Sequence, residues 1–167
     1  MPDDIEMPPE RGETPDSSTM IPTPGLRAIA LCRHAPPGEA PHVDLFLAPE
    51  NPAFGEDDRV LGSWRVPCDP RTLAPGTWVD IIPTPPHRGC YLQLRAPRQL
   101  DGNRGLLSPL AHGEAAVHWI TPRIRSLEIG WSDGSRTLLE LECARETGGN
   151  RSRLRRLEEP GTQDSAC

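Results

Sequence analysis

The chain contains no lysine, so all 18 of its basic residues are arginines. We attribute this bias chiefly to a GC-rich genome, and only in small part to the bidentate phosphate binding for which arginine is suited. Long apolar runs are absent as well, and nothing approaches the ~18 consecutive apolar residues that a membrane span requires. The first residues are acidic and polar, whereas a signal peptide begins basic and continues apolar. These absences predict a cytoplasmic protein that makes no contact with a membrane.

Recognisable thiol pairs are lacking too. The five cysteines are odd in number, widely spaced and contain no Cys-x-x-Cys, which argues against a disulfide framework and against a thiolate zinc site. We therefore expect reduced thiols at Cys32, Cys68, Cys90, Cys143 and Cys167.

The protein also lacks the positive charge of proteins that coat nucleic acid, since its formal net charge is −6. Much of this acidity lies in residues 1–25, which carry six acidic residues and one arginine. Residues 26–142 are nearly balanced, with fourteen acidic and twelve basic residues. A local basic groove in this central part is therefore compatible with the composition.

Both ends of the chain have the composition of disordered tails. Residues 1–25 combine Pro, Glu, Asp, Ser and Thr with almost no large apolar side chains, so they cannot bury enough surface to offset the entropy of ordering. Residues 144–167 are polar and rich in arginine, and their segment RSRLRRLEE predicts at most a short, frayed helical turn. We expect one folded domain over residues 26–143, which is within the usual size of a single domain.

Between the tails, the pattern is that of short strands separated by turns. The 21 prolines and 15 glycines argue against long helices. Apolar residues alternate in segments such as HVDLFLA, TWVDII, AAVHWI and RTLLELE, and SDGS before the last of these has the composition of a hairpin turn. We count seven or eight strands at regular spacing, which predicts an all-β fold, either a small antiparallel barrel or a sandwich.

Two histidines and an aspartate lie where two of these strands meet. His34 ends one strand, APPGEAP lets the chain turn back, and His42 and Asp44 share one face of the next strand. Two imidazoles and one carboxylate would leave coordination positions open for water or substrate on a divalent metal ion. An exposed strand face explains the same spacing equally well, so spacing alone leaves both interpretations open.

Four motifs in order then carry a resemblance to a known family. The segments PHVDLFL, LGSWRVP, HRGCYLQL and GNRG are similar, in the same order, to the 3′-phosphoesterase domain of bacterial DNA ligase D and its stand-alone relatives. The resemblance covers about residues 26–142. It implies a single compact antiparallel β-barrel that binds a manganese-type divalent ion and removes a terminal 3′-phosphate or ribonucleotide from DNA before ligation.

The resemblance also implies roles for individual residues. It makes His34, His42 and Asp44 the metal ligands, with manganese as the expected ion and zinc or cobalt as alternatives. His87 and Tyr91 match groups that help to hold the scissile phosphate, and we expect them to be catalytic. Without the resemblance, His87 could equally be a loop residue and Tyr91 a core ring. The implied partners are DNA 3′ ends and a DNA ligase or another end-joining protein.

Departures from that family, among them one at Phe46, bear on activity. Phe46 stands where many members have an arginine, which removes one phosphate ligand. Arg65, Arg88 or Arg104 can substitute, because a guanidinium binds phosphate oxygens in bidentate fashion. We therefore predict a metal-dependent 3′-phosphoesterase of DNA repair, with a catalytically degenerate module that binds DNA ends or a partner protein as the alternative. A small β-domain in which the motif matches are accidental is the third hypothesis.

We assign structural roles to the four tryptophans and to the two histidines that match no motif. Four tryptophans lie within apolar strand patterns, which favours core packing over a base-stacking platform. Two further histidines, six residues apart across a turn, match no motif, and we expect them at the surface or at the rim of the core. The residues concerned are Trp64, Trp78, Trp119, Trp131, His112 and His118.

Overall fold

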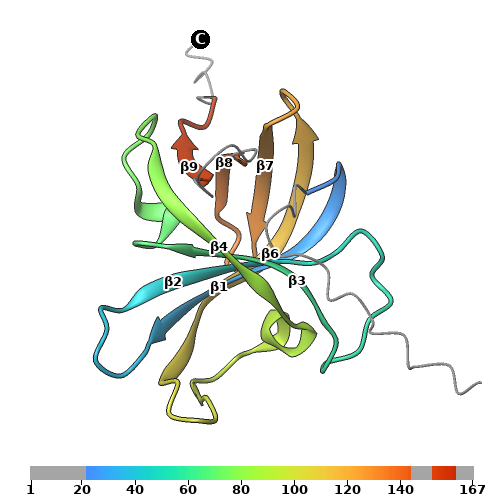
Figure 1. Ribbon diagram of the computed structural model, residues 1–167. Helices are drawn as coiled ribbons and strands as arrows, with labels where there is room; N and C mark the ends of the chain where they lie inside the picture. Colours follow the sequence, from blue (N-terminus) through green and yellow to red (C-terminus); the bar gives the residue numbers. More distant parts are fainter. Residues whose placement is uncertain (1–21, 144–151, 161–167) are drawn as a thin grey trace, which may run out of the picture.

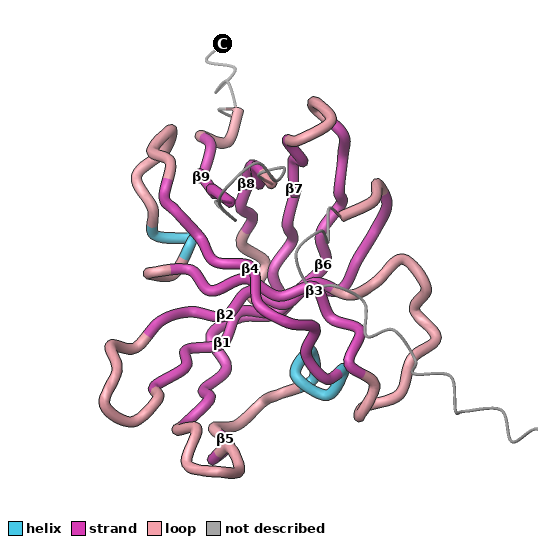
Figure 2. Tube along the Cα trace, viewed as in Figure 1, coloured by secondary structure: helices cyan, strands magenta, loops and turns pink. Residues whose placement is uncertain are grey.

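The computed structural model describes residues 22–143 and 152–160, and nearly all of its regular structure is strand (Figure 1, Figure 2). Among these residues, no helix has the length and apolar character needed to cross a membrane. Two short 3-10 helices interrupt the strands. The elements are β1 (Gly25–Ala35), β2 (His42–Leu47), β3 (Arg59–Val66), η2 (Pro70–Thr72), β4 (Val79–Arg88), η3 (Gly89–Gln93), β5 (Arg98–Gln99), β6 (Leu106–Trp119), β7 (Ile124–Trp131), β8 (Arg136–Glu142) and β9 (Ser152–Leu157).

Eight of these strands form a closed barrel. The strand order is β1-β2-β3-β4-β9-β8-β7-β6, every neighbouring pair is antiparallel, and the pairing of β1 with β6 closes the ring. The extra strand, β5, pairs with the first two residues of β6. The predicted all-β fold, a single antiparallel barrel of about eight strands, is therefore confirmed.

Side-chain alternation gives β2 two different environments. Val43, Leu45 and Leu47 belong to the larger apolar cluster, which contains residues of all eight barrel strands and therefore fills the barrel interior. Phe46 projects from the opposite face and belongs to a second cluster, formed with η3 on the outside of the barrel. Because all six residues of β2 are buried, the outer face of this strand is covered by other parts of the chain.

The predicted end of the folded domain at residue 143 is wrong, because β9 lies within the barrel. This strand pairs with β4 on one side and with β8 on the other, and the Leu154 side chain is 1% exposed in the interior. Arg153 Nε donates to Glu142 at 2.8 Å, and Arg155 Nε donates to Glu140 at 2.6 Å. These cross-strand partners neutralise the charge that made the segment resemble a solvated tail with a helical turn.

The predicted N-terminal boundary also differs from the observed one. β1 begins at Gly25, and residues 22–24 already contact the barrel. Arg125 Nε donates to the carbonyl oxygen of Pro22 at 2.8 Å, and the buried Arg27 donates to the carbonyl oxygen of Thr23 at 2.9 Å. The two arginines therefore hold the last residues of the predicted tail. The rest of the predicted tails, residues 1–21, 144–151 and 161–167, lies outside the described residues.

The tryptophans divide between the core and the surface. Trp64 and Trp131 are buried in the barrel interior, as expected. Trp78 is half-buried, with the guanidinium carbon of Arg155 4.5 Å from the centroid of its ring. The expectation of core packing is wrong for Trp119, which is 57% exposed because it ends β6 just before the connection to β7.

Candidate metal centre

The β1–β2 hairpin aligns the three predicted metal ligands on one face. His34 lies directly opposite His42, and Asp44 follows two residues along β2, opposite Cys32. Because residues two apart in a strand share a face, the three polar side chains project together from the outside of the barrel. One ligand atom from each of His34, His42 and Asp44 lies within 4.8 Å of the other two.

The carboxylate of Asp44 approaches both imidazole rings. Its Oδ2 is 3.5 Å from Nδ1 of His34, and its Oδ1 is 3.3 Å from Nε2 of His42. The two ring centroids are 4.9 Å apart, with an angle of 72° between the ring planes. A divalent ion bound among these groups would therefore meet two nitrogen ligands and one oxygen ligand.

Two of the three ligands are buried, with His42 7% and Asp44 6% exposed. Nε2 of His42 makes no hydrogen bond among the described residues, because the contact with Asp44 Oδ1 at 3.3 Å lacks hydrogen-bond geometry, although a buried polar atom normally has a partner. Burial lowers the pKa of His42, while the charge of Asp44 opposes this shift and that of Arg65 adds to it. A neutral imidazole with an unpartnered nitrogen is the form in which histidine binds a metal ion, so these residues fit a divalent ion.

The imidazole of the candidate ligand His34 is also held by a backbone group. Its Nε2 lies 2.7 Å from the carbonyl oxygen of Arg104, which precedes β6. Contacts of this kind fix the orientation of a ligating imidazole and are typical of metal-binding histidines.

His87 and Tyr91 lie against Phe46, on the outer face of β2 that also carries His42 and Asp44. His87 is near the end of β4, opposite Leu61 of β3, and Tyr91 is in η3. Both rings pack against Phe46, with centroid distances of 5.2 Å for His87 and 5.5 Å for Tyr91. Burial lowers the pKa of His87, and the charge of Asp44 opposes that shift. The ring of His87 therefore lies close enough to the candidate centre for the charge of Asp44 to affect the pKa of His87.

The two rings offer different polar atoms. Nδ1 of His87 donates to the carbonyl oxygen of Pro85 at 2.8 Å, so Nε2 retains a lone pair that can accept a proton. The Tyr91 ring is buried, and its phenolic oxygen can both donate and accept a hydrogen bond. The two ring centroids are 6.0 Å apart.

Arg65 is the predicted phosphate-binding arginine whose side chain lies next to the three ligands. It stands directly opposite Asp44, on β3. Its Nε is buried and has no hydrogen-bond partner among residues 22–143 and 152–160. Its terminal nitrogen lies 4.0 Å from Glu39, and about two fifths of the side chain remains exposed. The guanidinium is therefore available to bind an anion beside the candidate metal.

The other two predicted phosphate-binding arginines are engaged elsewhere. Arg88 forms an ion pair with Asp57, with 3.6 Å between the nitrogen and the oxygen. Arg104 contributes its backbone to His34, and its side-chain Nε donates to the carbonyl oxygen of Asp101 at 2.7 Å. The structure therefore gives neither guanidinium a contact with the three ligands.

Two side chains near the site were missed by sequence reasoning. Cys32 is buried directly opposite Asp44, and burial raises the pKa of its thiol to about 12, so the group is neutral. Its position two residues before His34 on the same strand was the available signal. Arg59 contributes a positive charge that helps to lower the pKa of His87. This arginine lies 28 positions earlier in the sequence, and no motif connects the two residues.

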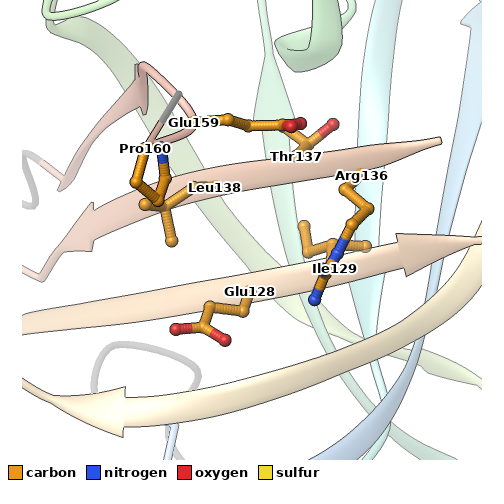
Figure 3. Close-up of a pocket in the computed structure, with 7 residues that line it drawn as sticks. All are labelled: Glu128, Ile129, Arg136, Thr137, Leu138, Glu159 and Pro160. Carbon is orange, nitrogen blue, oxygen red and sulfur yellow. The ribbon is translucent and has the colours of Figure 1, made fainter. Parts of the chain in front are cut away.

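A separate cavity of about 220 Å³ lies against β7, β8 and the residues that follow β9 (Figure 3). Its charged lining consists of Glu128, Arg136 and Glu159. The strands that form this cavity are not those that carry the candidate ligands, so the cavity is not part of the metal centre.

No protein-family model matches this sequence, and no curated protein is significantly similar to it. We therefore infer the function from the geometry of the candidate centre and from the four sequence motifs.

Proposed function

We propose that the protein is a divalent-metal-dependent 3′-phosphoesterase, which removes a 3′-phosphate or a 3′-ribonucleotide from DNA during repair. The observation that carries the proposal is the convergence of His34, His42 and Asp44 around a buried, unpartnered Nε2 of His42. The motif resemblance supplies the substrate class, because the same three residues match the metal ligands of that family. We further propose that the protein acts in the cytoplasm on DNA 3′ ends, with a DNA ligase or another end-joining protein as partner.

The donor set supports the metal part of this proposal. Two imidazole nitrogens and a carboxylate oxygen suit manganese, zinc or cobalt, and we propose manganese as the native ion because of the resemblance. When bound, a divalent ion polarises a phosphoryl oxygen and lowers the pKa of a water molecule. Three protein ligands leave coordination positions available for a phosphoryl oxygen and for a water molecule.

The surrounding side chains would act on the phosphate. Arg65 lies opposite Asp44 and about two fifths of its side chain is exposed, so its guanidinium can donate hydrogen bonds to phosphate oxygens. His87 is held by Pro85 and kept neutral by burial, so its Nε2 would accept a proton from the attacking water as a general base. Tyr91 would donate a hydrogen bond from its hydroxyl to a phosphate oxygen and help to orient the ester.

A catalytically degenerate module that binds DNA ends or a partner is the second candidate. Its support is Phe46, whose fully buried ring occupies the position of an expected arginine and packs against His87 and Tyr91. This ring supplies no hydrogen bond to a phosphate. A module of this kind would retain its metal ion and its DNA but would release no product.

The test is the release of product by metal-stripped protein that has been reloaded with manganese, zinc or cobalt. The substrates are DNA duplexes that end in a 3′-phosphate or a 3′-ribonucleotide, with 5′-phosphorylated DNA as the substrate control. We expect release with at least one ion and none from Asp44→Ala. Asp80→Ala removes an exposed carboxylate of β4 and should retain release. If the wild type releases no more product than Asp44→Ala but still binds DNA, the phosphoesterase proposal fails and the binding module stands.

A further inference from the structure

His34 contacts the protein through both of its ring nitrogens. Nε2 is 2.7 Å from the carbonyl oxygen of Arg104, and Nδ1 is 3.5 Å from the carboxylate of Asp44. A carbonyl oxygen can only accept, so this hydrogen bond requires a proton on Nε2. In the neutral ring, which is the form that binds a metal ion, the lone pair is then left on Nδ1, the nitrogen that faces Asp44.

We infer that the backbone carbonyl of Arg104 selects the Nε2–H tautomer of His34 and thereby commits Nδ1 to the metal ion. The assignment of the tautomer stands on the hydrogen bond alone. The consequence for metal binding rests on the proposed function, because it requires that His34 be a ligand. The contact joins residues 70 positions apart, so its formation depends on the completed fold rather than on the local β1–β2 hairpin.

The carbonyl reaches His34 because the chain turns tightly between β5 and β6. Gly102, Asn103 and Gly105 have positive φ angles of 69°, 55° and 92°. Glycine adopts such angles at no steric cost, and asparagine tolerates them better than most residues. The amide of Leu100 closes the turn by donating to the carbonyl oxygen of Gly105 at 2.9 Å.

Gly105 allows this turn to lie against the end of β1. A Cβ at this position would be 2.1 Å from the carbonyl oxygen of Ala35, the neighbour of His34. Any larger residue would therefore push the turn, and with it the Arg104 carbonyl, away from the imidazole. The side chain of Arg104 makes no contact with His34 and instead donates to Asp101. Gly105 is therefore a positioning residue, and the group that it positions is a backbone carbonyl.

The tautomer can be measured in the metal-free wild type, independently of any activity. Two-bond proton–nitrogen correlation spectra distinguish protonated from unprotonated ring nitrogens, and at about pH 8 an ordinary imidazole is neutral. Comparison with His34→Ala identifies the signals of this ring. We expect a protonated Nε2 and an unprotonated Nδ1. Protonation at Nδ1, or an even mixture of the two tautomers, would overturn the inference.

Three variants test the role of the turn, with zinc alone as a diamagnetic probe. Gly105→Ala should mix the tautomers and weaken zinc affinity by the ~10–100-fold that is typical of lost outer-shell contacts. Gly102→Ala is the matched control, because a Cβ there meets nothing within 4 Å although its φ is also positive. Arg104→Ala removes the guanidinium and keeps the carbonyl. Both controls should keep the wild-type tautomer.

The outcomes separate this inference from the proposed function. If Gly105→Ala folds and keeps both the tautomer and the zinc affinity, the turn does not position His34. If Gly105→Ala does not fold, the spectrum of the zinc-loaded wild type tests the inference instead. Zinc must then shift the nitrogen signal of His34 Nδ1 and leave Nε2 protonated. A protein that meets these expectations but releases no phosphate would refute the phosphoesterase proposal and leave the inference intact.

Discussion

The two faces of β2 are both buried, but they contribute differently to the molecule. Leu45 faces the barrel interior and belongs to the apolar cluster that contains residues of all eight barrel strands. Asp44, one residue earlier, faces outward beside His34 and His42. Burial of the leucine stabilises the fold by about 25 cal/mol per Å² of apolar surface. Burial of the carboxylate beside an unpartnered imidazole nitrogen costs free energy unless an ion binds there.

This difference shows how one strand can serve stability on one face and chemistry on the other. Alternation keeps the two sets of side chains apart, although they are consecutive in sequence. Substitutions on the inner face should therefore change the free energy of unfolding, and substitutions on the outer face should change metal binding or turnover.

The largest effect is expected when the barrel loses a strand. A chain that ends at Cys143 lacks β9, so β4 and β8 lose their shared partner and the interior loses Leu154. We expect no cooperative transition in thermal melts followed by circular dichroism, and no metal binding. A chain that ends at Pro160 retains every strand described and is the control. Cooperative unfolding of the shorter chain would show that β9 is dispensable for closing the barrel.

The same strand marks the limit of what the sequence could predict about the fold. The apolar alternation of segments such as HVDLFL was sufficient to predict strands and an all-β fold, and the motif resemblance favoured a barrel over a sandwich. In β9, by contrast, three of six residues are arginines. Arg153 and Arg155 are neutralised by Glu142 and Glu140 of β8. That compensation depends on the register between two strands, so it is visible only in the structure.

The next largest effect is expected at His87, which is not one of the three candidate ligands. His87→Ala should reduce product release by ~10²–10⁴-fold, the range of a positioned acid–base group. Folding and metal affinity should stay unchanged, because the variant leaves His34, His42 and Asp44 in place. Steady-state release and calorimetric titration with manganese measure the two properties. His118→Ala, at an exposed position on β6, is the control. Equal loss of release in both variants would contradict a specific role for His87.

Some residues of the candidate site could be predicted from the sequence more directly than others. His34, His42 and Asp44 belong to one hairpin, so strand periodicity alone was enough to align them. His87 and Tyr91 lie on β4 and η3 and were proposed only through the motif resemblance, because spacing does not indicate how a later segment packs. The contribution of Arg104 could not be predicted, since it is made by a backbone carbonyl and carries no side-chain signature.

Adjacent substitutions on β2 compare its two faces directly. Leu45→Ala should destabilise the protein by ~2–5 kcal/mol, the usual cost of truncating a buried leucine, and leave metal affinity unchanged. Asp44→Ala should still fold. Manganese at 100 times its Kd should stabilise the wild type by ~2.7 kcal/mol, and this stabilisation should be absent in Asp44→Ala. Urea unfolding with and without manganese measures both effects. If the folded Leu45→Ala protein binds manganese as weakly as Asp44→Ala, the two faces are not independent.

The smallest effect is expected for Tyr91→Phe, because this change removes one hydroxyl and keeps the ring. The packing of the ring against Phe46 and His87 should persist, so the free energy of unfolding should change by less than about 0.5 kcal/mol. If the hydroxyl donates to the phosphate, its loss should cost about 1 kcal/mol, or roughly fivefold in kcat. Steady-state kinetics and urea unfolding of the same preparation separate the two effects. A lower urea midpoint with unchanged kcat would mean that Tyr91 supports the outer cluster and does not contact the phosphate.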